Sequence, residues 1–279
     1  MRFVWQFLAV LAMYALTGNA LTAVKDDDWL ALVLGFVAAG LMLLVYAWVV
    51  RRTEHRPAPD VARKDAVSRT AWGVLIGVGM FGAVVANLVA AGHYEIDGLG
   101  SVTGALGLAG FMAGAAVAEE VVFRGVLFRI VEEHIGTYLA LVLTGLVFGL
   151  SHLLNEHATL WGALAIAVEA GFMLAAAYAA TRSLWLVIGV HFGWNFALGG
   201  IFSSEVSGND ANDGLLETTL SGPKLLTGGS FGPEGSVYAV AFGALLTLVF
   251  LWLAHRRGNV VRFGARRAAK ADSLATLPR

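Results

Sequence analysis

Long runs of apolar residues, separated by short groups of charged and polar residues, extend along almost the whole chain. Most of these runs have about the 20 residues that a helix needs to cross a bilayer core of about 30 Å. The pattern predicts eight membrane-spanning helices, at residues 3–24, 29–50, 70–92, 102–131, 137–154, 159–181, 184–200 and 236–254. We therefore predict an all-α, polytopic membrane protein.

The segments between the runs divide the chain further. The first run is predicted to be a retained helix rather than a signal peptide, because only Arg2 precedes its apolar stretch and no small-residue cleavage site precedes Lys25. Residues 51–69 form a basic linker, and residues 201–235 a polar loop long enough to be partly disordered. We expect N-terminal helices and a linker at 1–101, a core of helices at 102–200, and a loop, last helix and basic tail at 201–279.

The positions of the basic residues predict the orientation. With the N-terminus in the cytoplasm, 17 of the 19 Lys and Arg residues fall on the cytoplasmic side, and only Lys25 and Lys224 fall on the other. Eight spans then place both termini in the cytoplasm. The expected location is the plasma membrane of a prokaryote.

Composition excludes several classes of protein. The 279 residues are 58% hydrophobic and 14% charged, with a mean hydropathy of +0.72, whereas a soluble domain has about 45–50% apolar and about 25% charged residues. A soluble enzyme, a disordered chain and a nucleic-acid-binding protein are excluded. Because the chain has no cysteine, disulfides, thiol catalysis and cysteine-ligated metals are excluded as well.

A few ionisable residues lie inside the predicted spans, where they are costly and suggest a functional site. Adjacent Glu119 and Glu120 point about 100° apart on a helix, so they cannot have the same role. Glu120 and Arg124 have the spacing of an intrahelical ion pair, which leaves Glu119 to face another helix. A cap at the membrane interface is the alternative, but Arg129 lies about 15 Å further along, so we place Glu119 near the middle of the membrane.

Two later spans carry histidines. Gly145 and Gly149 form a face of small residues that lets another helix approach His152 closely. His191 and Asn195 are four residues apart and share a helix face. Asn195 is suited either to fix the tautomer of the imidazole or to donate its amide to a carbonyl oxygen.

The depths of these residues do not agree at first sight. His191 lies about 13 Å from Arg182, which matches the depth of Glu119, whereas His152 lies about 22 Å from Thr137. For a single site to form, the span at 137–154 must either tilt or begin below the cytoplasmic surface.

The three groups together form a pattern: EExxxR at Glu119–Arg124, FxxxH ending at His152 and HxxxN at His191–Asn195, in three membrane contexts. This order resembles the CAAX protease and bacteriocin-processing (CPBP) family of glutamate-dependent intramembrane endopeptidases, over residues 102–200. The resemblance implies that Glu119 is the general base, with Glu120 and Arg124 beside it, that His152 is the histidine of the second motif, and that His191 and Asn195 stabilise the oxyanion.

This assignment fits the chemistry of peptide hydrolysis, which needs a base to activate water and donors for the oxyanion. His152 can share the proton with Glu119. A serine mechanism is disfavoured because Ser151 and His152 are adjacent and project to different faces of a helix. The resemblance implies a membrane-tethered protein or peptide as substrate, within the lipid bilayer, including prenylated CAAX-type segments. The oligomeric state stays open.

A metal is the main alternative within this mechanism. Glu119, His152 and His191 form a set suited to zinc with an open fourth position, but no HExxH pair supplies two ligands from one helical turn. We favour a reaction that needs no cofactor.

Two other functions remain open. A proton-coupled transporter could use Glu119, His152 and His191 together with Glu169, a mid-span acid for which we favour a hydrogen bond to a neighbouring helix. No internal repeat of the kind common in transporters is recognisable. A non-catalytic scaffold or immunity protein is the third hypothesis, and the complete motif set counts against it.

Overall fold

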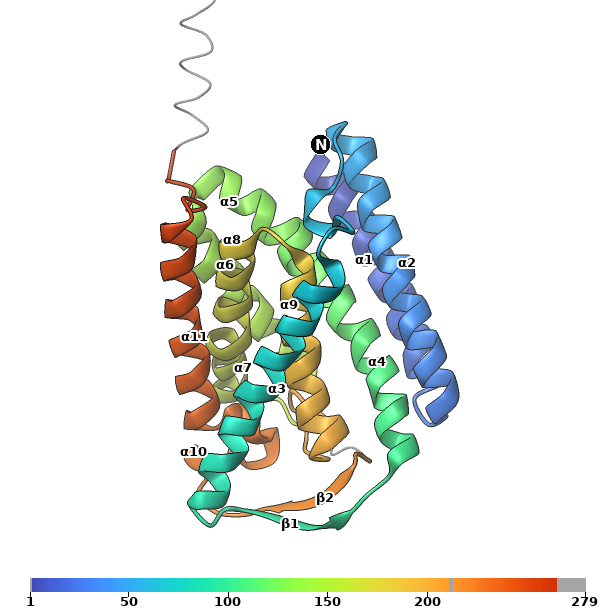
Figure 1. Ribbon diagram of the computed structural model, residues 1–279, viewed down its shortest axis with the longest axis vertical. Coiled ribbons are helices and arrows are strands. Elements are labelled where there is room, and N and C mark those ends of the chain that lie inside the picture. Colours follow the sequence, from blue (N-terminus) through green and yellow to red (C-terminus); the bar gives the residue numbers. More distant parts are fainter. Residues whose placement is uncertain (1, 211–212, 265–279) are drawn as a thin grey trace, which may run out of the picture.

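The computed structural model describes residues 2–210 and 213–264, and helices dominate it (Figure 1). The longer helices are α1 (Arg2–Thr22), α2 (Asp28–Glu54), α3 (Ala66–Ala90), α4 (Val102–Glu120), α6 (Thr137–Ser151), α9 (Leu184–Asn195) and α11 (Val237–Arg256). The shorter ones are α5 (Arg129–Ile135), α7 (Leu160–Ile166), α8 (Met173–Thr181) and α10 (Lys224–Thr227). Single 3₁₀ turns lie at η1 (Pro59–Val61), η3 (His152–Leu154), η6 (Gly229–Phe231) and η7 (Pro233–Gly235).

Within the described residues, eight helical stretches are long and apolar enough to cross a membrane, and they match the eight predicted spans. The predicted all-α membrane fold is therefore confirmed, with bounds that shift by a few residues. The largest shift shortens the linker predicted at 51–69, since α2 continues to Glu54 and α3 begins at Ala66. A helix satisfies its own backbone groups and can extend beyond the bilayer, so hydropathy marks the membrane boundary rather than the helix end.

In the part of the chain that the structure describes, three π-helical segments interrupt the spans, and the apolar pattern did not predict them. They are η2 (Val121–Phe128) after α4, η4 (Ala167–Phe172) between α7 and α8, and η5 (Phe196–Ile201) after α9. Glu120 immediately precedes η2, Glu169 lies within η4, and Asn195 immediately precedes η5. Because π segments are frequent at functional sites, their positions point to the same residues as the motifs.

Small residues let the central helices approach closely. A Cβ atom on Gly149 would lie 2.3 Å from the Ala163 carbonyl oxygen, and one on Gly145 would lie 2.3 Å from the Phe172 ring. The small face predicted on α6 is thus confirmed, and it packs α6 against α7 and η4. On α9, a Cβ on Gly193 would lie 2.5 Å from the Val74 carbonyl oxygen of α3.

A short sheet closes the end of the bundle opposite the N-terminus (Figure 1). It pairs β1 (Tyr94–Leu99) antiparallel with β2 (Leu216–Leu220), with an irregularity between Ile96 and Gly98. The segment 201–235, expected to be a partly disordered loop, contains β2, α10 and two 3₁₀ turns, while residues 211–212 lie outside the described residues. Tertiary contacts hold this outer segment: the Tyr94 hydroxyl lies 2.8 Å from Ser204 Oγ, and burial raises the pKa of Tyr94.

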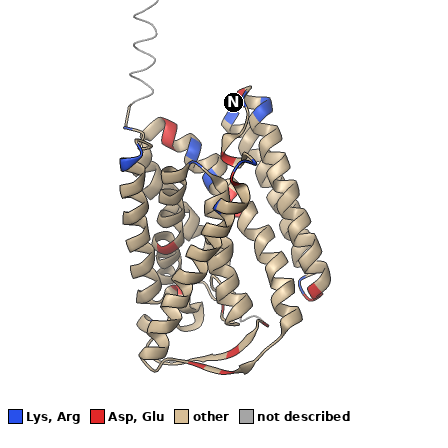
Figure 2. Cartoon of the chain, viewed as in Figure 1, with Lys and Arg blue, Asp and Glu red and all other residues tan. Residues whose placement is uncertain are grey.

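The N-terminus and the end of α11 lie at the same end of the bundle (Figure 1), and many Lys and Arg residues lie at that end (Figure 2). This arrangement is what an even number of spans requires and agrees with the predicted charge asymmetry. That this end faces the cytoplasm stays a prediction. Residues 265–279 of the basic tail lie outside the described residues.

Candidate active site

Glu120 and Arg124 form a buried ion pair at the junction of α4 and η2. Arg124 Nη1 donates to Glu120 Oε1 at 2.7 Å, as the i, i+4 spacing predicted. The Arg124 guanidinium also donates to the carbonyl oxygens of Ala170 and Gly171 in η4 and lies 4.4 Å from the centre of the Phe148 ring. Glu120 is fully buried, so the alternative of a cap at the membrane interface is wrong for this residue.

Glu120 also fixes His191 on α9. The His191 Nδ1 atom lies 2.8 Å from the same Glu120 Oε1. Because a carboxylate accepts, Nδ1 is the protonated nitrogen and Nε2 carries the lone pair of the neutral ring. From the sequence, Asn195 was one candidate for fixing the tautomer of the His191 imidazole. Although Asn195 is on the same helix, the imidazole turns toward α4, where the carboxylate is a stronger acceptor than an amide.

Glu119 lies on the other side of the same imidazole. Its Oε2 atom is 3.9 Å from His191 Nε2, too far for a hydrogen bond. This oxygen is buried and has no hydrogen-bond partner, although the side chain as a whole is 20% exposed. Two adjacent carboxylates thus face the two nitrogens of one imidazole, and only Glu120 binds directly. The geometry leaves Glu119 and Nε2 positioned to bind a third group between them.

His152 follows the last residue of α6 and begins η3. Its Nδ1 donates to the Phe148 carbonyl oxygen at 2.8 Å, so Nε2 carries the lone pair of the neutral ring. Ser151 Oγ lies 3.5 Å from that Nδ1, although the two side chains were predicted to project to different faces of a helix. The Ser151 hydroxyl donates to the same Phe148 carbonyl oxygen. Because this Nδ1 is already a donor, it cannot take a proton from Ser151, and a serine mechanism through this contact is excluded.

The start of α6 bears on the disagreement in depth between His152 and His191, and the depth in the membrane stays a prediction. Thr137 is fully buried, and its backbone N–H donates to the Val261 carbonyl oxygen of the segment after α11. A Cβ on Gly136 would contact that same segment. The helix therefore begins beneath a covering of chain, the second of the two arrangements that the sequence required for one site.

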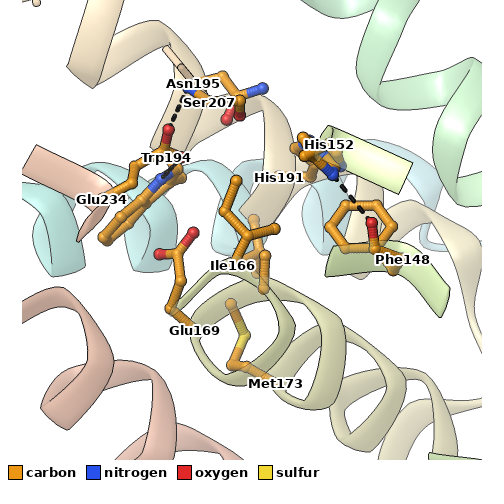
Figure 3. Close-up of a pocket in the computed structure, with 12 residues that line it drawn as sticks. Phe148, His152, Ile166, Glu169, Met173, His191, Trp194, Asn195, Ser207 and Glu234 are labelled. Carbon is orange, nitrogen blue, oxygen red and sulfur yellow. Dashed lines mark hydrogen bonds between the residues drawn. The ribbon is translucent and has the colours of Figure 1, made fainter. Parts of the chain in front are cut away.

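Residues of the second and third motifs line a small cavity (Figure 3), and the first motif reaches its edge through the contact of Glu120 with His191. Its volume is about 10 Å³, close to the minimum for one water molecule. His152, His191 and Asn195 line it, and Glu119 does not, since it lies against Nε2 of His191. The remaining lining residues come from α6, α7, η4, α8, α9 and the outer segment: Phe148, Ile166, Glu169, Ala170, Met173, Val190, Trp194, Ser207 and Glu234.

The sequence did not single out Glu234, which falls within the polar loop predicted at 201–235. It is 2% exposed, and its Oε1 accepts from Trp194 Nε1 at 2.8 Å. Its Oε2 accepts from the backbone N–H of Ser207. Burial raises the pKa of this carboxyl group, while the two hydrogen bonds oppose the shift. No local pattern marks Glu234, because its partners are 27 and 40 residues away.

Within the described residues, three buried side-chain oxygens have no hydrogen-bond partner: Glu119 Oε2, Glu120 Oε2 and Glu169 Oε1. All three belong to the motif residues or to the cavity wall. The hydrogen bond to a neighbouring helix that the sequence favoured for Glu169 is not made by Oε1. Since native structures leave few buried polar atoms unsatisfied, this concentration marks the region as functional.

The spacing of ligand atoms bears on the zinc alternative. Of the described residues, the group whose ligand atoms all lie within 4.8 Å of one another is Glu156, His157 and Asp210, at the surface. Glu119, His152 and His191 do not form such a group, so they would have to move together to bind zinc. The present geometry does not fit a metal held by these three residues.

Comparison with known families gives one match. Residues 101–197 match the family model described as type II CAAX prenyl endopeptidase Rce1-like. No curated protein matches the chain, and no solved structure matches it. The matched region includes all three motifs and agrees with the range 102–200 over which the sequence resembles the CPBP family. Residues 101–197 of this multi-pass membrane protein are therefore similar to the Rce1-like CAAX endopeptidase family, and this similarity suggests a protease.

Proposed function

We propose that the protein is an intramembrane endopeptidase that hydrolyses a peptide bond of a membrane-tethered protein or peptide, with Glu119 as the general base. The carrying observation is the pair of atoms Glu119 Oε2 and His191 Nε2, which face each other at 3.9 Å without bonding. A water placed between them can donate one proton to each and direct its lone pair at a carbonyl carbon. The proposed location is the plasma membrane of a prokaryote.

Glu120 and Arg124 position the imidazole in this mechanism. Glu120 accepts from Nδ1 and thereby keeps the Nε2 lone pair directed at the water. Arg124 neutralises Glu120 in a buried environment, where an unpaired charge is costly. Glu119 then takes the proton of the attacking water and delivers it to the leaving amine, as general acid–base catalysis requires.

Asn195 is the proposed donor to the oxyanion. A neutral His191 with its proton on Nδ1 has no N–H left for a carbonyl oxygen, and the same holds for His152. The amide of Asn195 carries two N–H groups in every protonation state and lines the cavity. His152, whose Nδ1 donates to the Phe148 carbonyl oxygen, therefore acts as an acceptor or proton relay through Nε2.

The decisive experiment compares wild type with Glu119→Gln on a membrane-tethered, prenylated peptide reporter. We expect kcat/KM to fall by about 10³-fold, because the amide cannot accept the proton. Glu156→Gln, an exposed acid outside the cavity, is the matched control and should retain activity. Full activity of a folded Glu119→Gln variant would refute the assignment.

The same reporter tests the role of metal. We propose a metal-free reaction, so dialysis against a strong chelator should leave the rate unchanged. Loss of activity on chelation, with recovery on adding zinc, would instead favour the set Glu119, His152 and His191.

A further inference from the structure

A second pair of buried carboxylates, Glu169 and Glu234, lines the cavity beside His191. Glu169 belongs to η4 and Glu234 to η7, which precedes α11, and both are at most 2% exposed. Figure 3 shows the Glu169 carboxylate extending toward the side of the cavity formed by Trp194 and Glu234. The mechanism proposed above uses neither of them.

The two carboxylates differ in how they are satisfied. Glu234 accepts from Trp194 and from the Ser207 backbone, so protein groups hold it in place. Glu169 Oε1 is buried and accepts no hydrogen bond. Helix α11 packs directly behind Glu169, because a Cβ on Gly243 would lie 2.2 Å from the Glu169 Cα. The unsatisfied oxygen is therefore confined by packing on one side and directed into the cavity on the other.

The cavity also places two acidic side chains together without a Lys or Arg beside them. No Lys or Arg is among its lining residues, and its two histidines already donate their Nδ1 protons to Glu120 and to the Phe148 carbonyl. Burial raises the pKa of Glu234. A cation bound between the carboxylates would oppose that shift and supply the missing donor to Glu169.

We propose that Glu169 and Glu234 form a subsite for a primary ammonium group of the substrate, next to the scissile peptide bond. This inference rests on the proposed endopeptidase function. An ammonium group is compact and carries three donors, which suits a cavity of about 10 Å³, whereas the planar guanidinium of arginine is larger. The group can come from a lysine side chain or from a free peptide N-terminus.

The first experiment measures selectivity with pairs of membrane-tethered peptide reporters. In each pair, lysine near the scissile bond is replaced by norleucine, which has the same aliphatic stem without the ammonium group. N-acetylated and free versions separate the two sources of the ammonium. We expect kcat/KM for the ammonium-bearing reporter to exceed that of its partner by about tenfold in the wild type, the size of one charge-assisted hydrogen bond.

For each variant, the measured quantity is the ratio of kcat/KM for the ammonium-bearing reporter to kcat/KM for its paired reporter. The ratio should fall to about one in Glu169→Gln and in Glu234→Gln, because an amide keeps the shape but removes the charge. The control Glu156→Gln, outside the cavity, should keep the wild-type ratio. Glu119-dependent cleavage with a wild-type ratio of one for both ammonium sources would overturn the subsite while leaving the proposed function intact.

A second experiment needs no proteolysis. Thermal unfolding of the purified protein is measured with n-butylammonium and, as the neutral control, n-butanol. We expect butylammonium alone to raise the midpoint of the wild type, since a ligand that binds only the folded state stabilises it, and to have no effect on Glu169→Gln. A raised unfolding midpoint without cleavage of any reporter supports the subsite and counts against the endopeptidase function. An unchanged midpoint, or an equal rise with butanol, counts against the subsite.

Discussion

Among the clusters of buried polar residues in the described part of this helical bundle, two are satisfied to very different degrees. The first, which we term the terminal network, consists of Gln6, Glu54 and Arg129 at the end that carries the N-terminus. Arg129 donates to Glu54 at 2.8 Å, to Gln6 at 2.7 Å and to the Gly125 carbonyl at 2.7 Å. Gln6 in turn donates to Glu54 at 2.8 Å. The network joins α1, α2 and α5 through complementary contacts.

The second cluster is the candidate active site, where Glu119, Glu120 and Glu169 each keep a buried oxygen without a partner. Residue types are similar in the two clusters. The buried polar groups of the terminal network find hydrogen-bond partners within the protein, whereas those of the active site do not all find one. A completed network stabilises the fold, whereas unsatisfied groups held by packing are available to bind water, substrate or a proton. The contrast separates a structural use of buried charge from a functional one.

Removing Arg129 should have the largest effect on stability. Arg129→Leu removes the donor to Glu54, Gln6 and the Gly125 carbonyl. Arg56 still pairs with Glu54, so we expect a loss at the lower end of the range for a broken buried pair, about 3 kcal/mol in the free energy of unfolding. Unfolding of the purified protein in mixed micelles with increasing SDS measures it. The control is Arg256→Leu, an exposed arginine lying over the Trp252 ring, with an expected loss below about 1 kcal/mol. Equal losses in the two variants would remove the distinction between the clusters.

Replacing Glu169 should have a smaller effect of the opposite sign. Glu169→Leu removes a buried oxygen that has no partner, so we expect a gain of about 1 kcal/mol in the same unfolding measurement. Its counterpart is Glu132→Leu, which removes a buried carboxylate that accepts from Arg182 and, at 2.6 Å, from Thr137. That variant should lose stability. If Glu169→Leu loses as much as Glu132→Leu, Glu169 is a structural residue.

The smallest expected effect concerns the outer segment that closes the cavity. The hydrogen bond to Asp210 raises the pKa of His157, a surface residue. Because the folded pKa lies above the unfolded value of about 6.5, the contribution of this pair is complete below that pH and is lost as the pH rises through the folded value. Hydrogen exchange at 205–210, corrected for the intrinsic pH dependence, should become faster over that range.

The control for this pH dependence is His157→Gln, which should abolish the change at 205–210. The β1–β2 amides serve as an internal reference, because they do not depend on the pair. A pH response at 205–210 that persists unchanged in His157→Gln would assign it to another group.

Local patterns were sufficient for features that depend on neighbours in sequence. The eight spans follow from runs of apolar residues, and the Glu120–Arg124 pair follows from a four-residue spacing within one helix. The small face of α6 could also be predicted, because Gly145 and Gly149 recur with the same spacing. Each of these depends on periodicity alone, and periodicity is visible in the sequence.

Other features depend on contacts between distant segments, and the sequence could not reveal them. Glu120 and His191 are 71 residues apart, and Glu234 reaches Trp194 across 40 residues. The π segments beside Glu120 and Asn195 could not be predicted from the apolar pattern either. An extra residue in a helical turn leaves the run of apolar residues as hydrophobic as before.

By itself, the sequence determined the membrane fold, the family resemblance over residues 102–200 and the short set of ionisable residues inside the spans. That set is short because a charge inside a bilayer costs free energy, so ionisable residues are rare there and usually functional. The tertiary structure decided how those residues are used. In the tertiary structure His191 is hydrogen-bonded to Glu120 rather than to Asn195, and Glu119 faces the Nε2 atom of His191. Glu169 and Glu234 line the same cavity. The physical reason is that hydrogen-bond partners are selected by distance and direction in space, and helix packing sets both.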